Sequence, residues 1–353
     1  MKIVLICFSD NPDLQELFYS LSCEPSPHSV YTIGITNPKY SFVHTSRNFF
    51  YPCPKRPGIT LKTFDVFLLS RIIRQLKKIQ PDVIYFESIH VWNLFILSHL
   101  RFRCPFVSSI HDVKPHSDDL KGHLIKKITN IVAKRSDAIF LRSDFEFRSF
   151  CDLYPRFSHK AFFFPLSKHF SSFSPLTNES YVLFFGRMTQ YKGLDEFYEI
   201  ARKCPDVNFV VAGKFDDHSL SLKFQSLSNI KVIDRYISDQ ELFDFLIGSF
   251  CVIAPYKAAT QSGVAIQAFQ CSRPVIAFDV GGLHEQILNG VDGYLIPPGD
   301  IDGFAHQIQA ISSLPFSEKN QMCKNSFDIG KDKFSSSNNA SLFYKMLKEI
   351  HDL

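Results

Sequence analysis

Short apolar runs alternate with amphipathic segments along most of the chain. Each run has the length of a buried strand, and the apolar residues between the runs recur at helical spacing. Because strands that alternate with helices form parallel sheets, this pattern predicts an α/β fold. The expected strands are residues 1–8, 30–35, 82–86, 105–110, 137–141, 181–185, 209–212, 230–233, 251–254 and 274–278.

The helical segments indicate which faces are buried. Between residues 64 and 79, leucine and isoleucine recur every three or four positions, while arginine and lysine occupy the other face. Residues 118–135 and 336–350 show the same kind of pattern, and Ser238 with Glu241 forms a capping box for another helix. Residues 37–60 follow no period, so we expect a long loop that either packs on its own aromatic residues or contacts a ligand.

Length and a local change of composition predict two domains. With 353 residues and 45% hydrophobic content, the chain exceeds the size at which single cores usually split. Residues 167–180 are rich in serine and proline and follow no period, as is typical of a linker. We therefore expect a first Rossmann-like domain at residues 1–166 and a second at 181–335. A C-terminal helix at 336–353 is a candidate for packing back on the first domain.

Charge and cysteine content exclude several classes of protein. The net charge of +4, from 39 basic and 35 acidic residues, is too small for a dedicated nucleic-acid binder. Nine cysteines without a CxxC pair fit neither a disulfide scaffold nor a zinc site, so we expect reduced thiols in the cytoplasm. The first apolar run is too short for a signal peptide, and no segment approaches the roughly 18 apolar residues of a membrane span. Any membrane contact should therefore be peripheral.

A loop with glycines and positive charges follows the expected strand at 181–185. Gly186 allows a sharp turn at the end of the strand, and Gly193 clears space where the next helix begins. The free N–H groups of a helix start attract anions, while Arg187 and Lys192 add a bidentate and a mobile positive charge. The loop is therefore a candidate pyrophosphate site. A surface turn with two solvated cations is the alternative.

Two more glycine-bearing loops follow the strands at 251–254 and 274–278. In the first, small residues and Gly263 let backbone amides approach a ligand, and Gln267 projects from the following helix toward a hydroxyl group. The second contains Gly281 and Gly282. Three such loops at one sheet edge form a crevice of the kind in which nucleotides bind. Ordinary connections between strands and helices are the alternative.

These motifs resemble the retaining glycosyltransferases of family 4, which have the GT-B fold of two Rossmann-like domains facing a central cleft. Residues 185–193 are similar to the family's phosphate motif, residues 273–282 to its donor-sugar loop, and residues 289–298 to the segment that usually follows. The resemblance implies that Arg187 and Lys192 neutralise a departing nucleoside diphosphate, with no metal and no cofactor. The donor-binding residues that it implies are Gly186, Thr260, Gln261, Ser262, Gly263, Gln267, Gly281 and Gly282.

The chain departs from the family pattern in two places. Ala259 and Gln267 stand where the family has two glutamates. The amide of Gln267 can still bind the ribose hydroxyls, and the loop backbone with Gln261 or Ser262 is expected to replace the other carboxylate. Residues 8–12 replace the glycine-rich loop that commonly follows the family's first strand.

A His-Asp pair follows the expected strand at 105–110. By resemblance, His111 contacts the donor sugar and the leaving phosphate, while Asp112 fixes the tautomer of the ring or the loop. A pair that satisfies a buried turn is the alternative. Glu87 and His90, after the preceding strand, are candidates for acceptor binding or for helix capping.

The resemblance implies transfer of a hexosyl group from a nucleoside-diphosphate sugar to a saccharide acceptor, with retention at the anomeric carbon. Basic segments at 71–78 and 121–135, with the aromatic and basic stretch 39–56, suggest docking on the inner face of an anionic membrane. Ordinary solvated helix faces are the alternative. If docking occurs, we expect a lipid-linked acceptor in surface-polysaccharide synthesis. The competing functions are a sugar-nucleotide epimerase of the same fold and a catalytically degenerate partner subunit.

Overall fold

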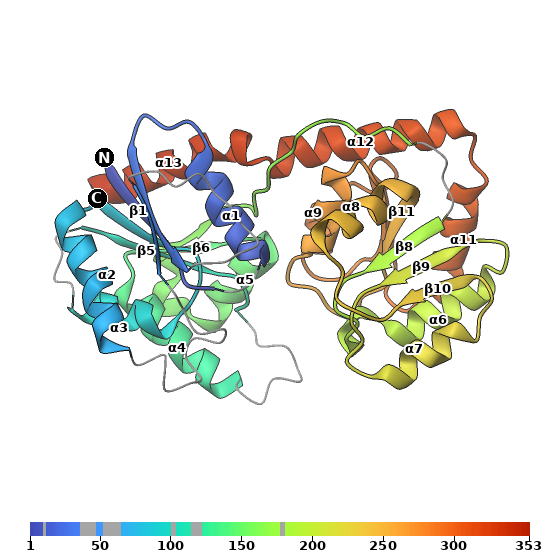
Figure 1. Cartoon of the computed structure of the whole chain (residues 1–353), viewed down its shortest axis with the longest axis horizontal. Helices are drawn as coiled ribbons and strands as arrows, with labels where there is room; N and C mark the ends of the chain where they lie inside the picture. The colour runs from blue at the N-terminus through green and yellow to red at the C-terminus, as the bar shows by residue number, and fades with distance from the viewer. Residues whose placement is uncertain (10–11, 36–46, 52–64, 100–103, 114–121, 177–180) are drawn as a thin grey trace. The chain divides into compact units, whose positions relative to one another are not determined.

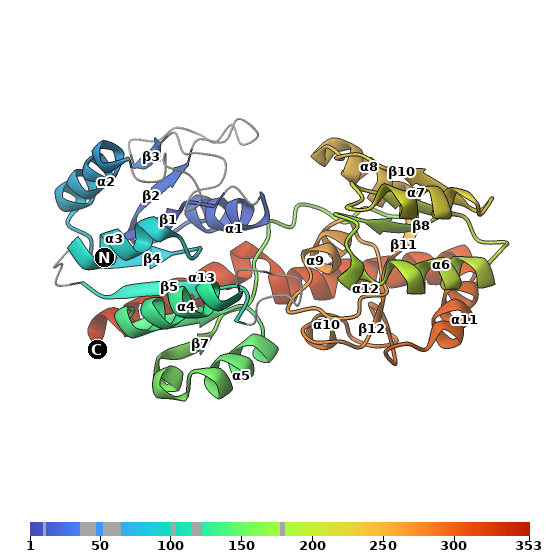
Figure 2. The same cartoon turned by 90° about the horizontal axis from the view of Figure 1, so that it is seen from below.

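The computed structural model describes the chain except residues 10–11, 36–46, 52–64, 100–103, 114–121 and 177–180. The chain forms two compact units (Figure 1). Unit 1 comprises Met1–His169 and Ser335–Leu353, and unit 2 comprises Phe170–Phe334. Each unit has a parallel sheet with helices on both faces, so the predicted α/β fold with two Rossmann-like domains is confirmed (Figure 1 and Figure 2).

The sheet of unit 1 has seven parallel strands in the order β3-β2-β1-β4-β5-β6-β7. The strands are β1 (Lys2–Cys7), β2 (Ser29–Ile35), β3 (Asn48–Tyr51), β4 (Val83–Phe86), β5 (Phe106–Ile110), β6 (Ala138–Leu141) and β7 (Ala161–Phe163). The strand order changes direction between β1 and β4, the position at which open sheets of this type bind ligands. Glu87 follows β4 and His111 follows β5, so both residues lie at this edge.

The helices of unit 1 form where the sequence places an apolar stripe. Asp65 caps α2 by accepting a hydrogen bond from the Leu68 amide, and Leu69, Ile72 and Leu76 are buried in the core beneath the helix. The helical elements are α1 (Pro12–Cys23), α2 (Val66–Ile79), α3 (Val91–His99), α4 (Gly122–Arg135), α5 (Asp144–Leu153), the 3₁₀ helix η2 (Pro155–Lys160) and α13 (Ser336–Asp352).

The C-terminal helix α13 belongs to unit 1. The Phe343 ring meets the Tyr85 ring edge-on at 4.9 Å between centroids, and the Tyr344 hydroxyl donates a hydrogen bond of 2.7 Å to the carbonyl oxygen of Leu21. Phe343 and Leu347 are completely buried. The last helix of the chain therefore completes the core of the first unit.

The chain passes between the units at His169–Phe170 and again at Phe334–Ser335. Within the expected linker 167–180, Lys168 is buried in unit 1, where its Nζ lies 2.8 Å from the Glu16 carboxylate. Phe170 packs its ring on Phe327 in unit 2. Apart from residues 177–180, which lie outside the described residues, this segment is thus divided between the two folded units, because its aromatic and charged side chains find partners there.

The sheet of unit 2 has six parallel strands in the order β10-β9-β8-β11-β12-β13. The strands are β8 (Tyr181–Phe185), β9 (Phe209–Ala212), β10 (Ile230–Ile233), β11 (Ser249–Ala254), β12 (Val275–Phe278) and β13 (Gly293–Ile296). The helical elements are η3 (Gln190–Lys192), α6 (Leu194–Lys203), α7 (His218–Gln225), α8 (Asp239–Gly248), α9 (Gly263–Gln270), α10 (Leu283–Gln286), α11 (Ile301–Ser312) and α12 (Phe316–Phe334). The capping box of Ser238 and Glu241 at the start of α8 is confirmed.

One strand lies where the sequence predicted an irregular loop. Strand β3 occupies four residues of the stretch 37–60 and pairs in parallel with β2 at the edge of the sheet. So short a strand leaves little periodicity in the sequence, and its hydrogen bonds come from a neighbour in the tertiary structure. Apart from Arg47, the rest of that stretch lies outside the described residues.

The structure also describes the state of the cysteines and the character of the helices. The eight cysteines in the described ranges form no disulfide bonds with one another, and six of them are buried. Among the helices that the structure describes, none combines the length and apolar character needed to cross a membrane.

Candidate active site

Three loops of unit 2 meet at one edge of the sheet. They follow β8, β11 and β12, which are neighbouring parallel strands, so their carboxyl ends lie side by side. Gly193 has φ +73°, and a Cβ there would lie 1.7 Å from the carbonyl oxygen of Pro255. Gly281 has φ +52°, and a Cβ there would lie 1.7 Å from the carbonyl oxygen of Ala259. These positions need glycine because the backbone of the neighbouring loop occupies the space of a side chain.

The loop after β8 has the predicted strand, loop and helix arrangement. Gly186 ends the strand with φ +108°, and the loop passes through η3 to the start of α6. Arg187 is exposed, so its guanidinium group is accessible to a ligand from solution. Glu196, in the first turn of α6, holds Lys257 of the next loop at 3.2 Å between carboxylate and ammonium. This ion pair joins two of the three loops.

The Lys192 side chain is buried and contacts the end of β8 and the loop after β11. Lys192 has an exposed fraction of only 6%, and its Nζ donates a hydrogen bond of 3.3 Å to the carbonyl oxygen of Phe185. The same ammonium group lies 5.2 Å from the centre of the Tyr256 ring, in a cation–π contact. A Cβ at Gly186 would lie only 2.5 Å from this Nζ. The glycine and the aromatic ring together hold a positive charge beside the loop.

The loop after β11 leads into α9. Ser262 caps this helix by accepting a hydrogen bond from the Ala265 amide. Gln286 holds the Ser262 backbone from α10, because its Oε1 accepts from the Ser262 amide at 2.9 Å and its Nε2 donates to the Ser262 carbonyl at 3.1 Å. Thr260, Gln261, Gly263 and Gln267 are partly exposed. The predicted residues of unit 2 are thus gathered in three adjoining loops and the first turns of α9.

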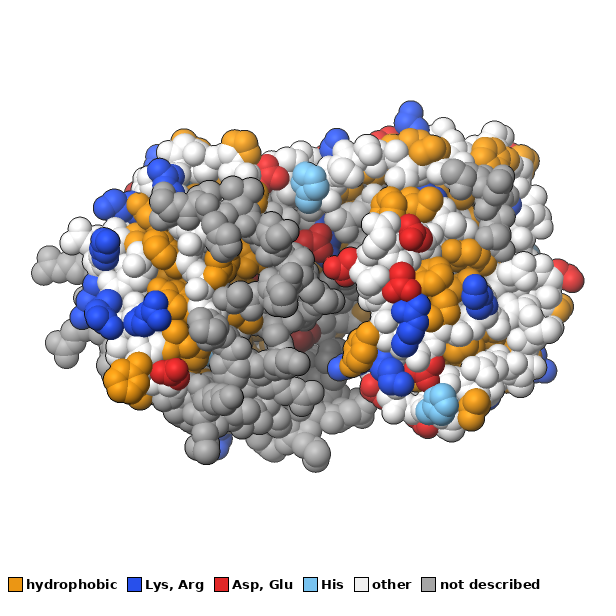
Figure 3. All heavy atoms as spheres, viewed as in Figure 1, with side chains coloured by type: hydrophobic (Ala, Val, Ile, Leu, Met, Phe, Trp, Pro, Cys, Tyr) orange, Lys and Arg blue, Asp and Glu red, His pale blue; other side chains and the backbone are white. Residues whose placement is uncertain are grey.

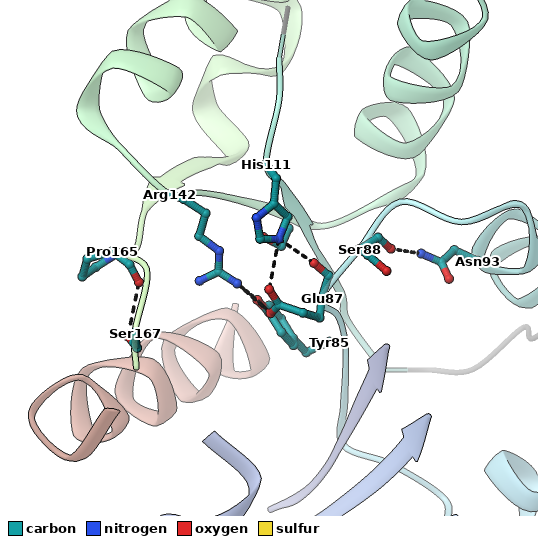
Figure 4. Close-up of polar contacts among 9 residues, drawn as sticks. Tyr85, Glu87, Ser88, Asn93, His111, Arg142, Pro165 and Ser167 are labelled. Atoms are coloured by element: carbon teal, nitrogen blue, oxygen red, sulfur yellow. Dashed lines mark hydrogen bonds and ion pairs between the residues drawn. The ribbon is translucent and has the colours of Figure 1, made fainter. Parts of the chain in front are cut away.

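Figure 4 shows the corresponding group in unit 1, where His111 lies beside Glu87. His111 Nε2 is 3.0 Å from Glu87 Oε1 and 2.8 Å from the Glu87 backbone oxygen. Glu87 Oε2 accepts hydrogen bonds from the Tyr85 hydroxyl at 2.6 Å and from Arg142 Nη2 at 2.7 Å. Arg142 also contacts the Tyr85 hydroxyl. Four side chains from the ends of β4, β5 and β6 therefore form one network.

The network keeps Glu87 ionised although it is buried. Burial raises the pKa of the Glu87 carboxyl, but Arg142, with the hydrogen bonds from His111 and Tyr85, outweighs burial and lowers this pKa below its usual value. Burial also raises the pKa of Tyr85 well above its usual value, so its hydroxyl stays a donor.

Three unit 1 residues lie in surroundings that the sequence did not predict. Glu87 has an exposed fraction of 0%, and His111 and Arg142 hold its carboxylate within unit 1. Asp112, expected to fix the tautomer of the ring or the loop, is exposed, and His111 Nε2 faces Glu87. His90 is buried, and its Nδ1 accepts a hydrogen bond of 3.2 Å from the Trp92 amide, which is the capping alternative. Acceptor binding by Glu87 or His90 stays a prediction.

His90 is also shielded by aromatic rings. The rings of Phe8 and Trp92 lie 5.5 and 5.2 Å from its own. Burial lowers the pKa of His90 to about 4, so this ring is neutral at physiological pH.

Sequence reasoning missed several residues of both groups. Arg142 directly follows the apolar run 137–141, and a cation at the end of a buried strand was a usable signal. Tyr256 likewise follows a buried strand. Gln286 had no local signal, because its partner Ser262 is 24 residues away. Within the described residues, no three His, Cys, Asp or Glu side chains are grouped so that they could hold a metal ion.

Two family models match the chain. One, described as "Glycosyltransferase Family 4", matches residues 4–160, and the other, "Glycosyl transferases group 1", matches residues 179–313. The chain belongs to glycosyltransferase family 4. The predicted family is therefore confirmed.

Relatives in the family share part of the chain. An "Uncharacterized 42.6 kDa protein in cps region" of Klebsiella pneumoniae is 31% identical over 143 residues, which are 39% of this chain and 34% of the relative. A D-inositol 3-phosphate glycosyltransferase of Mycobacterium sp. (strain KMS) is 29% identical over 143 residues, 38% of this chain and 33% of the relative. The chain thus spans about a third of the length of these curated relatives.

Solved structures share the fold over the whole length. HepE of Anabaena, in complex with UDP and glucose, has a TM-score of 0.76 and 16% identity, covering 99% of this chain and 100% of its own. HepE has also been solved in complex with UDP-glucose. This likeness confirms the predicted GT-B fold of this family 4 chain.

Proposed function

We propose that this protein transfers a hexosyl group from a nucleoside-diphosphate sugar to a saccharide acceptor, with retention of configuration and without a metal. The observation that carries the proposal is the edge of unit 2 where three loops meet. There the buried ammonium of Lys192, the exposed Arg187 and the starts of α6 and α9 lie on adjoining loops. Fixed positive charge and free backbone N–H groups stabilise the charge that develops on a departing diphosphate.

The donor class has support from similar proteins. HepE, which has the same fold, is known with UDP and with UDP-glucose, so UDP-glucose is the first donor to test. We further propose that Gln267 binds the ribose hydroxyls and that His111 of unit 1 acts on the sugar or the leaving phosphate.

The first experiment measures donor binding and transfer with matched arginine variants. A ligand that binds only the folded state raises the melting temperature, so a panel of nucleotide sugars should reveal the donor. Arg187→Ala should lose about 2–4 kcal/mol of transition-state stabilisation, because one charge that faces the diphosphate is gone. The control is Arg202→Ala, an exposed arginine at the other end of α6, which should keep normal kcat/KM.

The products separate the competing functions. NMR should show the same anomeric configuration in donor and product, and EDTA should leave the rate unchanged. Interconversion of sugar nucleotides without an acceptor would instead identify an epimerase. Donor binding without turnover for any acceptor would identify a degenerate partner subunit. Normal turnover by Arg187→Ala would show that the loop after β8 does not bind the diphosphate.

We also propose that unit 1 docks on an anionic membrane through α2, which would favour a lipid-linked acceptor. Figure 3 shows basic side chains over α2 with apolar side chains next to them. Val66 is 68% exposed and Phe67 87% exposed at the start of this helix. A cavity of about 630 Å³ between α2 and β3 is lined by Asn48, Phe49, Phe50, Tyr51, Arg71, Arg74, Gln75 and Lys78. An exposed apolar end beside a basic face suits the boundary between lipid headgroups and acyl chains.

Vesicle co-sedimentation tests this docking. Wild type should sediment with phosphatidylserine vesicles in low salt and not with neutral ones, since each basic residue at an anionic surface contributes about 1 kcal/mol. Reversing Arg71, Arg74 and Lys78 to glutamate should abolish sedimentation. A control with the same charge change on unit 2, Arg202→Glu with Lys223→Glu and Lys231→Glu, should still sediment. Equal sedimentation with neutral and anionic vesicles, or equal loss in both triple variants, rules out docking by α2.

A further inference from the structure

The geometry around His111 assigns hydrogens to its two ring nitrogens. Nε2 lies 2.8 Å from a backbone carbonyl oxygen and 3.0 Å from a carboxylate oxygen, both of residue Glu87. Neither oxygen carries a hydrogen, so Nε2 must donate. In the neutral imidazole, Nδ1 is then an acceptor. Ser109 Oγ lies farther from Nε2, at 3.4 Å.

Glu87 is itself held in place by buried partners. Its second oxygen, Oε2, accepts from Tyr85 and Arg142, and the guanidinium carbon of Arg142 lies 5.2 Å from the centre of the Phe164 ring. The side chains of Glu87 and Arg142 are 0% exposed, while that of His111 is 20% exposed. Only the histidine in this network therefore reaches the surface. The buried pair stands behind it and fixes its orientation.

We propose that Glu87 is a positioning residue, which holds His111 with Nε2–H directed inward and Nδ1 as the atom offered to the donor. Arg142 and Tyr85 serve to hold the Glu87 carboxylate at its position. This inference rests on the proposed role of His111 at the donor. It gives Glu87 the role of fixing the tautomer of His111, one of the two roles that the resemblance implied for Asp112, and it is a second candidate reason, besides acceptor binding, for a carboxylate after β4.

An Nδ1 without a hydrogen can accept a hydrogen bond from a hydroxyl group of the donor sugar. Such a bond orients the sugar ring. If positive charge develops on the imidazole, the carboxylate behind Nε2 stabilises it, as carboxylates do for histidines that act in other enzymes. A change at Glu87 should therefore alter turnover through His111 and leave nucleotide binding in unit 2 unchanged.

A purely structural role for the same network is the competing explanation. The pair joins the carboxyl ends of β4 and β6, and removal of one partner alone leaves a buried charge without compensation. The test variant therefore removes both charges, as Glu87→Gln with Arg142→Met. Tyr344→Phe is the control for stability, because it removes a buried hydrogen bond elsewhere in unit 1, to the carbonyl oxygen of Leu21.

Kinetics with the full-length protein distinguish the two explanations. The double variant should lower kcat about tenfold to hundredfold with KM for the nucleotide sugar unchanged, as loss of an orienting carboxylate typically does. Tyr344→Phe should keep its kcat, and Arg142→Lys, which retains the charge, should keep most of the wild-type kcat. In a His111→Ala background, the same two substitutions should change kcat by less than about twofold, since they act through the histidine.

The ring nitrogens can be observed without any enzyme assay. Nitrogen NMR of the wild type should show His111 with a protonated Nε2 and a bare Nδ1. The double variant should keep this tautomer, because the backbone oxygen of residue 87 still accepts from Nε2. A protonated Nδ1 in the wild type overturns the inference, as does wild-type kcat in the double variant or an equal loss in the His111→Ala background. If no donor is turned over, the proposed function fails, while the NMR result still decides the position of the hydrogen.

Discussion

Two buried carboxylates show how this chain treats a charge that is removed from water. Glu87 is compensated by Arg142 at 2.7 Å and remains ionised. Asp292, in the turn before β13, is fully buried, and its Oδ1 accepts from the Leu288 amide at 2.7 Å. Its Oδ2 has no hydrogen-bond partner among the described residues, and burial raises the pKa of Asp292 to about 6. The two residues differ because only Glu87 has a cation at contact distance.

Asp292 should make unit 2 less stable as the pH rises. Its folded pKa of about 6 exceeds the unfolded value, so its contribution to stability is complete below about pH 4 and is lost as the pH rises through 6. Relative to Asp292→Asn, which does not titrate, the unfolding free energy of the wild type should fall by roughly 2–3 kcal/mol between about pH 4 and pH 7. Urea unfolding of both proteins at the two pH values measures this difference, and parallel pH dependences would contradict it.

At the scale of elements, the candidate site depends on loops that touch through their backbones. A Cβ at Gly193, Gly281 or Gly282 would fall within about 2 Å of a carbonyl oxygen in the loop after β11. The strand order places these loops side by side, and because the three glycines have no side chains, the loop backbones can come into contact. The same approach brings Lys257 to Glu196 and places the ring of Tyr256 beside Lys192.

A pair of glycine variants separates close approach from backbone conformation. Gly193 and Gly290 have similar φ, +73° and +79°, but a Cβ at Gly290 would have no atom within 4 Å. Gly290→Ala should therefore cost only about 1–2 kcal/mol for the left-handed conformation. Gly193→Ala should cost more and should also weaken UDP binding, because the loop after β11 must move. Thermal unfolding with UDP titration measures both effects, and equal losses in the two variants would show that the contact with Pro255 is unimportant.

At the scale of the molecule, the chain returns to its first unit at the end. Unit 2 is one continuous segment, Phe170–Phe334, whereas unit 1 is built from two segments that join only when α13 folds onto the rest. Phe343 contacts the rings of Tyr85, Phe140 and Phe164. We therefore expect unit 1, and not unit 2, to depend on α13 for its stability.

Truncation tests this dependence. A chain that stops after Phe334 loses the buried side chains of Phe343, Leu347 and Ile350. Loss of a buried phenylalanine costs about 3–5 kcal/mol, and loss of a buried leucine or isoleucine about 2–5 kcal/mol. Unit 1 should then unfold at a much lower temperature in calorimetry, while the transition of unit 2 stays unchanged. Stopping after Ile350 removes only exposed residues and serves as the control. A single transition at the wild-type temperature after removal of α13 would contradict the assignment of this helix to the core of unit 1.

Features that depend on near neighbours could be predicted from the sequence. The strand, loop and helix at 181–203, the capping box at Ser238 and the glycine loops could be predicted because periodicity and turn chemistry act over a few residues. The family motifs could be identified for the same reason, since each is a continuous run. His111 was found through such a motif.

Which of these residues come into contact depends on the packing of distant segments. Glu87 reaches His111 across 24 residues and Arg142 across 55, and Gln286 reaches Ser262 across 24. Strand β3 and the anchoring of Phe170 on Phe327 also need distant partners. The sheet order brings the ends of separate strands to one edge, and burial there decides whether a carboxylate faces a ligand or a guanidinium. No local pattern encodes that choice, which is why the contact of Glu87 with His111 and Arg142 could not be predicted from the sequence.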